Sequence, residues 1–438
     1  MKNWLMNRGS KGAHGKAVGH CRSGCGVCRC FRSSSKLEKL RRLRVAALQL
    51  IAAMRRRNFH ERVKFLMSFT TNCESQSGPA GATCGRTGSS TRTAPDTRTL
   101  ILVSVLAVAA LLILNSCAPK TDPATKGASN VVGSIARLDP AFDSLVPKDA
   151  QIEKLAGGFT FAEGPLWRPS GVLWFSDVVG NVVRQWAPDG TVSVLLQPGG
   201  YDGNSLPAGG FIGPNGMIAD KDGAVLLCQH GNRRIVRINK DRLVSVLVDH
   251  FEGKRLNSPN DLVYKSDGSL YFTDPPYGLL KQDEDPRKEL KFNGVFRLAD
   301  GKLQVVIKDL TRPNGIAFSP DQKILYVANS DEKRKIWMMY DVQPDGRVQN
   351  GRVFFDVTAE KEDGLPDGMK LDTNGNLYCA GPGGIWVFSP EGKHLGTIKP
   401  PETPANCNWG DGGNTLYITA RTGLYRIKLA AQGQRPLY

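Results

Sequence analysis

Six oxygen-bearing residues recur at one position of a repeated phrase, and together they have the chemistry of a cation site. Each lies ten or eleven residues before an apolar residue of the strand that follows. The set is Glu163, Asn215, Asn260, Asn314, Asp367 and Asn406. A single Asn or Asp beside Pro is more typical of a turn, so the shared register is the informative feature. Carboxylate and amide oxygens suit Ca²⁺, with Zn²⁺, Mg²⁺ or Mn²⁺ as alternatives.

The phrase that carries these residues opens a repeating unit of about 40–50 residues, a length typical of propeller blades. Two copies read SPNDLVYKSDGSLYFTD and RPNGIAFSPDQKILYVAN. One unit divides into four short strands, at 161–168, 172–178, 181–187 and 191–197, joined by turn residues that favour antiparallel hairpins. Six units predict an all-β fold, a six-bladed β-propeller over 151–438. Because the last unit is short, we expect Gln151–Gly158 to complete it.

Equal offsets in equivalent blades place side chains at equivalent positions. We therefore expect the six oxygen-bearing residues to surround the mouth of a central channel. Asp177, Asp274 and Asn329 end their second strands, which return to the same end of the blade, and His230 occupies a comparable place. The alternation predicts that these groups stand on the rim, where they would contact substrate or support the ring. Asn215 is a further candidate for substrate contact.

Several motifs in the expected order resemble the gluconolactonase, senescence marker protein and luciferin-regenerating enzyme family. They are AEGPLW, SPNDLV, YFTDPPYGL, RPNGIAFSPD, LPDGMKLD and TLYITA, and the resemblance covers Lys154–Lys428. It implies a six-bladed propeller with one exchangeable divalent metal, usually Ca²⁺, that hydrolyses sugar lactones or other esters.

The resemblance also implies roles for individual residues. By motif, Glu163, Asn314 and Asp367 match metal ligands, Asn260 matches a residue that contacts metal or substrate, and Asp367 matches the proposed general base. Animal members carry an arginine two residues before the Asn that is Asn260 here, whereas this chain has Ser258. The resemblance therefore does not imply the animal mode of sugar binding.

The chemistry of the ring agrees with lactone hydrolysis. A cation polarises a lactone carbonyl and stabilises the charge that develops on its oxygen, and Asp367 can accept the proton of the attacking water. Alternatively, Asp367 is only a ligand and the metal activates the water. Two other functions fit the same propeller: hydrolysis of aryl esters or organophosphates, and non-catalytic ligand binding at the cell envelope.

Most of the positive charge lies near the N-terminus. Residues 1–117 contain 20 Lys or Arg and four Asp or Glu, so they account for +16 of the formal net charge of +17. The rest of the chain is nearly neutral, which disfavours a nucleic-acid partner. Its cysteines Cys228, Cys379 and Cys407 lie in or beside apolar strands, and we expect buried thiols.

The segment Leu100–Leu114 is apolar, too short to span a bilayer comfortably, and fits a secretory signal. Its LNSC ending resembles a lipobox, which makes Cys117 the expected lipidation site; a plain signal or a single anchor helix is the alternative. We expect a non-native or disordered leader at 1–98, a signal at 99–117 and a linker at 118–150. The propeller would then be extracytoplasmic, in the periplasm or cell envelope, with membrane contact only through the lipid.

Overall fold

The computed structural model describes residues 130–204 and 210–434. The expected leader at 1–98, the signal segment at 99–117 and the lipidation site Cys117 lie outside these residues. Among the residues that are described, no helix is long and apolar enough to cross a membrane.

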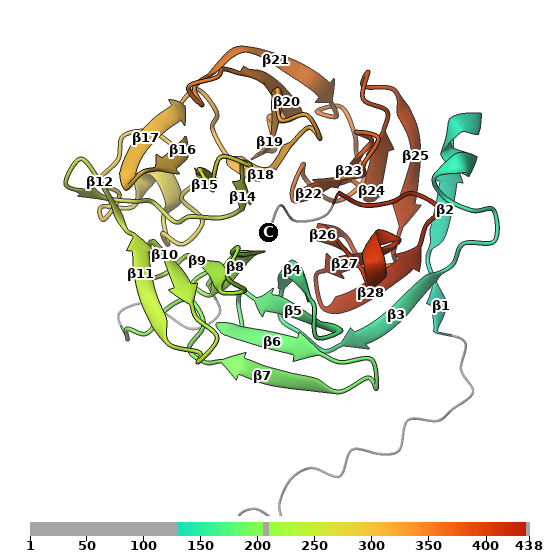
Figure 1. The fold of residues 1–438 in the computed structure, drawn as a ribbon, viewed down its shortest axis with the longest axis horizontal. Coiled ribbons are helices and arrows are strands. Elements are labelled where there is room, and N and C mark those ends of the chain that lie inside the picture. The colour runs from blue at the N-terminus through green and yellow to red at the C-terminus, as the bar shows by residue number, and fades with distance from the viewer. Residues whose placement is uncertain (1–129, 205–209, 435–438) are drawn as a thin grey trace, which may run out of the picture. The chain divides into compact units, whose positions relative to one another are not determined.

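Six antiparallel sheets are arranged around a common axis, as Figure 1 shows. Within a blade, strands follow one another from the axis outward. The first three blades are β4 (Ala162–Arg168), β5 (Val172–Asp177), β6 (Val182–Trp186) and β7 (Val192–Leu196); β8 (Pro214–Ala219), β9 (Val225–Gln229), β10 (Arg234–Ile238) and β11 (Val244–Val248); and β14 (Leu262–Tyr264), β15 (Leu270–Asp274), β16 (Gly294–Ala299) and β17 (Lys302–Ile307). The fourth blade is formed by β18 (Pro313–Phe318), β19 (Ile324–Asp331), β20 (Arg334–Val342) and β21 (Val348–Asp356). The fifth blade is formed by β22 (Met369–Leu371), β23 (Leu377–Gly381), β24 (Gly384–Phe388) and β25 (His394–Lys399).

The sixth blade joins the two ends of the propeller. Its strands β26 (Pro404–Gly410), β27 (Thr415–Ala420) and β28 (Gly423–Lys428) come from the end of the chain, and β3 (Ile152–Gly157) pairs with β28. This confirms the expected closing strand at Gln151–Gly158. The six-bladed propeller of four-stranded antiparallel blades is also confirmed, including the four strands predicted for the first blade.

The linker expected at 118–150 is structured over its described part. β1 (Val131–Val132) pairs with β3, and β2 (Ser134–Arg137) adds a fifth strand to the blade of β25. A 3-10 helix, η1 (Pro140–Ser144), follows, and Asp139 caps it by accepting a hydrogen bond from the Ala141 N–H at 2.9 Å. The Pro, Asp and Ser of this segment suggested a linker, but they form a cap and a turn that bury Phe142 completely.

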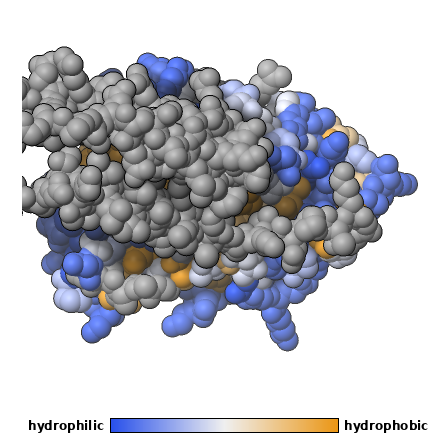
Figure 2. Space-filling model, turned by 90° about the horizontal axis from the view of Figure 1, so that it is seen from below, coloured by the Kyte–Doolittle hydropathy of each residue, from blue (hydrophilic) through white to orange (hydrophobic). Residues whose placement is uncertain are grey.

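Apolar faces of neighbouring blades pack against each other, for example Tyr378 and Ile385 with Trp409 and Ile418. Cys228, Cys379 and Cys407 are buried and free, as expected. The described surface visible in Figure 2 is mostly hydrophilic, with scattered hydrophobic residues. The short elements β12 (His250–Phe251), β13 (Lys254–Arg255), η2 (Gln282–Glu284) and η3 (Asp411–Gly413) complete the fold.

Candidate functional site

The six predicted ring residues all lie where an inner strand begins. Four are the second or third residue of β4, β8, β18 and β26, while Asn260 and Asp367 stand two residues before β14 and β22. In β4, β8, β18 and β26 the ladder register shifts beside the ring residue. Such bulges re-aim side chains and are common next to active sites. The common placement confirms the predicted register.

The amides of the ring direct their N–H groups to protein acceptors. Asn260 Nδ2 donates to Asn314 Oδ1 at 2.9 Å, and Asn314 Nδ2 donates to Ser330 Oγ at 2.8 Å. Asn406 Nδ2 donates to Glu163 Oε2 at 3.0 Å. Each of these amide nitrogens is already bonded within the protein, and the oxygens of the ring are the atoms that suit a cation.

The two ring carboxylates are held in an environment that disfavours their charge. Glu163 is 3% exposed, and burial, followed by the charge of Asp261, raises the pKa of Glu163 to about 7. Burial, followed by the charge of Glu163, raises the pKa of the half-buried Asp367 well above its usual range. A cation at the ring would reduce this cost, because opposite charge stabilises the ionised form.

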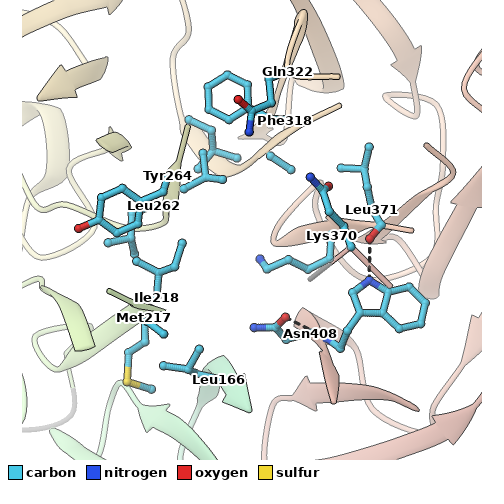
Figure 3. Close-up of a pocket in the computed structure, with 16 residues that line it drawn as sticks. Leu166, Met217, Ile218, Leu262, Tyr264, Phe318, Gln322, Lys370, Leu371 and Asn408 are labelled. Carbon is cyan, nitrogen blue, oxygen red and sulfur yellow. Dashed lines mark hydrogen bonds between the residues drawn. The ribbon is translucent and has the colours of Figure 1, made fainter. Parts of the chain in front are cut away.

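Two charged residues near the ring were missed by the sequence analysis. Asp261 is 4% exposed, and its Oδ2 has no hydrogen-bond partner within the described part of the chain. Lys370 projects into the channel farther along the inner strands, among Leu166, Met217 and Leu371 (Figure 3). A signal for Asp261 does exist, because the equivalent residue after the ring position is Gly in four of the other blades.

A cleft of about 630 Å³ opens beside Asp367. Phe161 and Phe211 form one wall, with ring centroids 5.0 Å apart in an edge-to-face arrangement. Arg421, which makes an ion pair with Asp363, lines another part of the cleft. A small substrate can therefore lie between an aromatic wall and a polar one while it contacts Asp367.

A family model described as SMP-30/Gluconolactonase/LRE-like region matches residues 161–422. The chain belongs to this family. It is 38% identical over 344 residues to a gluconolactonase of Zymomonas mobilis, a match that covers 76% of this chain and 96% of that relative. The structure resembles that of a gluconolactonase from Xanthomonas campestris, with a TM-score of 0.60 and 34% identity, over 70% of this chain and 99% of the other. The chain is also 24% identical over 277 residues to the diisopropyl-fluorophosphatase of Loligo vulgaris, covering 59% and 85% of the two chains.

In this member of the family, Asp177, Asp274 and Asn329 lie at or near the ends of their second strands, and their contacts fit the predicted support of the ring rather than a contact with substrate. All three are fully buried. They hold backbone N–H groups of the segment that leads to the ring residue of their own blade: Asp177 accepts from Phe161 at 3.0 Å, Asp274 from Asn257 at 2.7 Å and Asn329 from Arg312 at 2.9 Å. Strand alternation predicted where these residues lie along the blade, but it did not predict that their side chains accept hydrogen bonds from the backbone of the same blade. Their role in the structure is to position the ring.

Asp274 makes a testable contribution to stability. Burial raises the pKa of Asp274 to about 7 in the folded protein, against about 3.9 in an unfolded chain. The folded state therefore holds the proton more tightly, so this stabilisation is present below pH 4 and is lost as the pH rises through 7. In the wild type, the unfolding free energy should therefore decrease between pH 4 and pH 7, by on the order of 1.4 kcal/mol per unit of pKa difference. In Asp274→Asn, we expect this decrease to be absent. Urea unfolding of the wild type and Asp274→Asn at pH 4 to 8 measures this difference. If the unfolding free energies of the two proteins change with pH in parallel, the prediction is wrong.

His230, Ser330 and Arg421 occupy equivalent positions near the ends of the second strands of their blades. Each directly follows the residue that pairs with the Pro at the start of β8, β18 or β26. His230 Nε2 lies 3.1 Å from Asn215 Nδ2, just as Ser330 Oγ accepts from Asn314. His230 was a predicted substrate contact; the structure places it fully buried behind Asn215. Ser330 and Arg421 were not among the predicted site residues, although they stand at the same place in their blades as His230 does in its own.

Ser258, two residues before Asn260, fastens a loop. Its hydroxyl donates to Pro275 O at 2.7 Å and accepts from the Gly278 N–H at 2.8 Å. Tyr277 lies between these residues, half-buried, and burial followed by the charge of Asp367 raises the pKa of Tyr277. Ser258 thus fastens the loop that carries Tyr277.

The residues present fit a hard cation. No group of three or more His, Cys, Asp or Glu side chains suited to a metal occurs in the described ranges, so a cation would depend on amide oxygens as well as carboxylates. Glu163, Asn260, Asn314 and Asp367 supply both kinds of ligand. Oxygen donors of this type suit Ca²⁺ or a similar divalent ion.

Proposed function

We propose that this chain is a divalent-metal-dependent lactonase that opens sugar lactones. The observation that carries the proposal is the pair of carboxylates, Glu163 and Asp367, whose charge is disfavoured by burial, with Asp367 lining a cleft. The similarity to two gluconolactonases supports the reaction. Glu163, Asn260, Asn314 and Asp367 are the residues proposed to hold the cation, and Ca²⁺ is the proposed ion.

The chain's own residues have separate roles in the proposed reaction. When bound, the cation would supply Lewis acidity toward the lactone carbonyl. Asp367 accepts a proton from water as the water oxygen bonds to the carbonyl carbon. The bond from that carbon to the ring oxygen then breaks, the ring oxygen gains a proton, and the product is an open hydroxy acid. The cleft wall of Phe161 and Phe211 holds the substrate beside Asp367.

A hydrolysis assay of the full chain tests the proposal. We expect turnover of D-glucono-1,5-lactone that a chelator abolishes and added Ca²⁺ restores, because the cation would supply the Lewis acidity toward the lactone carbonyl. Release of acid followed at constant pH measures it, with the spontaneous rate subtracted. Turnover that ignores chelation, or none on any lactone with metal restored, would refute the proposal.

A second candidate reaction is hydrolysis of aryl esters or organophosphates on the same ring. The aromatic wall of Phe161 and Phe211 favours it, since an aryl group packs well on such a surface, and the likeness to the fluorophosphatase supports it. The same assay with phenyl acetate and diisopropyl fluorophosphate separates the two candidates. Higher kcat/KM on these substrates than on sugar lactones would make this the main activity.

We also propose an extracytoplasmic location, in the periplasm or cell envelope, with a lipid on Cys117. The apolar run at Leu100–Leu114 and the LNSC ending support it. Mass spectrometry of the native N-terminus tests it, and intact peptides from residues 1–60 would contradict it.

A further inference from the structure

Asn215 has a buried amide oxygen with no hydrogen-bond partner among the described residues. The residue as a whole is 6% exposed. Leaving a buried acceptor unpaired is unfavourable, and such groups in native structures call for an explanation such as an unseen ligand. The other end of the same amide is occupied, because Asn215 Nδ2 lies 3.1 Å from His230 Nε2.

His230 determines which end of the amide is occupied. Its Nδ1 lies 3.2 Å from the backbone oxygen of Phe211, and a carbonyl can only accept, so Nδ1 carries the proton. Burial lowers the pKa of His230 to about 4, so the ring is neutral and Nε2 presents a lone pair. Nε2 can therefore accept only from the Asn215 N–H, and the Asn215 oxygen is left free.

Asn215 is connected to the cleft through His230. His230 bonds to the backbone of Phe211, and Phe211 lines the same cleft as Asp367. The side chain of Asn215 makes no hydrogen bond to another ring residue in the described structure, unlike Asn260 and Asn314, which bond to each other. Asn215 is thus set apart from the residues proposed to hold the cation.

We propose that Asn215 accepts a hydrogen bond from a substrate hydroxyl and that His230 is its positioning residue. The inference rests on the proposed lactonase function and assigns a residue to its substrate preference: Asn215 would favour lactones that carry a hydroxyl over unsubstituted lactones. The hydroxyl supplies the donor that the buried oxygen lacks. A site built to bind a hydroxyl discriminates strongly against an analogue without it, because its own polar group is then left unpaired.

The test compares two substrates in the full chain with Ca²⁺. The quantity is the ratio of kcat/KM for D-glucono-1,5-lactone to kcat/KM for δ-valerolactone, which has no hydroxyl. Asn215→Leu removes the acceptor. His230→Asn keeps a donor near the Nδ1 position but loses the acceptor at Nε2, whereas His230→Gln can restore an acceptor there. His394→Asn is the matched control, because burial also lowers the pKa of His394 to about 4, and His394 lies on β25 stacked 4.1 Å from Trp386.

We expect the ratio to fall at least about tenfold in Asn215→Leu and His230→Asn, the scale of one hydrogen bond. The ratio should be largely retained in His230→Gln and unchanged in His394→Asn. The Ca²⁺ concentration that gives half of the thermal stabilisation should not change in any variant.

Three results would overturn the inference while leaving the lactonase function intact: equal losses on both substrates, equal losses in the two His230 variants, or weaker Ca²⁺ binding in Asn215→Leu. The last would make Asn215 a cation ligand. A wild-type chain inactive on both lactones with Ca²⁺ would refute the proposed function, and the inference would fall with it.

Discussion

Replacing Asp367 with Asn should lower kcat for lactone hydrolysis at least about 10²-fold, the usual scale for losing a general base. Asn has nearly the same shape and keeps one oxygen toward the ring, but it cannot accept the proton of the attacking water. The backbone at this position is fixed independently, since the Asp367 N–H donates to Ala380 O at 2.9 Å. The substitution should therefore act on chemistry more than on folding.

Rates at saturating substrate over a range of Ca²⁺ concentrations measure this effect. Asp345→Asn is a suitable control, because it removes one negative charge from an exposed turn that is paired with Arg347; its kcat should match the wild type. If excess Ca²⁺ restores full turnover to Asp367→Asn, then Asp367 serves only as a ligand. Near-normal turnover at ordinary Ca²⁺ would remove Asp367 from both roles.

The fold and the ring were predictable because one pattern is repeated in six blades. A single PND or PNG phrase is indistinguishable from a turn, whereas a constant offset from the polar residue to the second strand fixes both the blade and the place in it. The closing strand β3 was predictable for a related reason, since the last unit contains too few residues for four strands. Repetition thus supplied long-range information that a local pattern lacks.

The parts that could not be predicted depend on contacts that occur once. Strand alternation brings Asp177 and Asp274 to the correct end of their blades, but it does not tell whether a carboxylate faces solvent or accepts backbone N–H groups. Lys370 enters the channel from the middle of an inner strand, where the sequence shows only one basic residue in an apolar pattern. The segment at 130–150 was misjudged because turn residues that cap a short helix resemble those of a linker.

Replacing Glu163 with Gln should separate cation binding from folding. Gln is isosteric and retains an oxygen that can accept from Asn406 or from the Gly164 N–H, the two contacts that Glu163 makes. It removes one of the two charges proposed to attract the cation, and at short range a unit charge is worth several kcal/mol even at an effective dielectric constant of about 20. We expect the Ca²⁺ concentration needed for half-maximal thermal stabilisation to rise at least about 10²-fold.

The same substitution should not destabilise the protein without metal. At pH 8 Glu163 is ionised in a buried site, since burial and Asp261 raise the pKa of Glu163 only to about 7, and a buried charge without a cation opposes folding. The unfolding free energy of metal-free Glu163→Gln at pH 8 should equal or exceed that of the wild type. The control Glu391→Gln changes a fully exposed glutamate. It should alter neither the Ca²⁺ concentration for half-maximal thermal stabilisation nor the unfolding free energy without metal. If Glu163 is a ligand, its replacement raises the Ca²⁺ requirement and removes an unfavourable buried charge. A Glu163→Gln variant that is less stable without metal, yet responds to Ca²⁺ as the wild type does, would instead show that Glu163 is a structural residue.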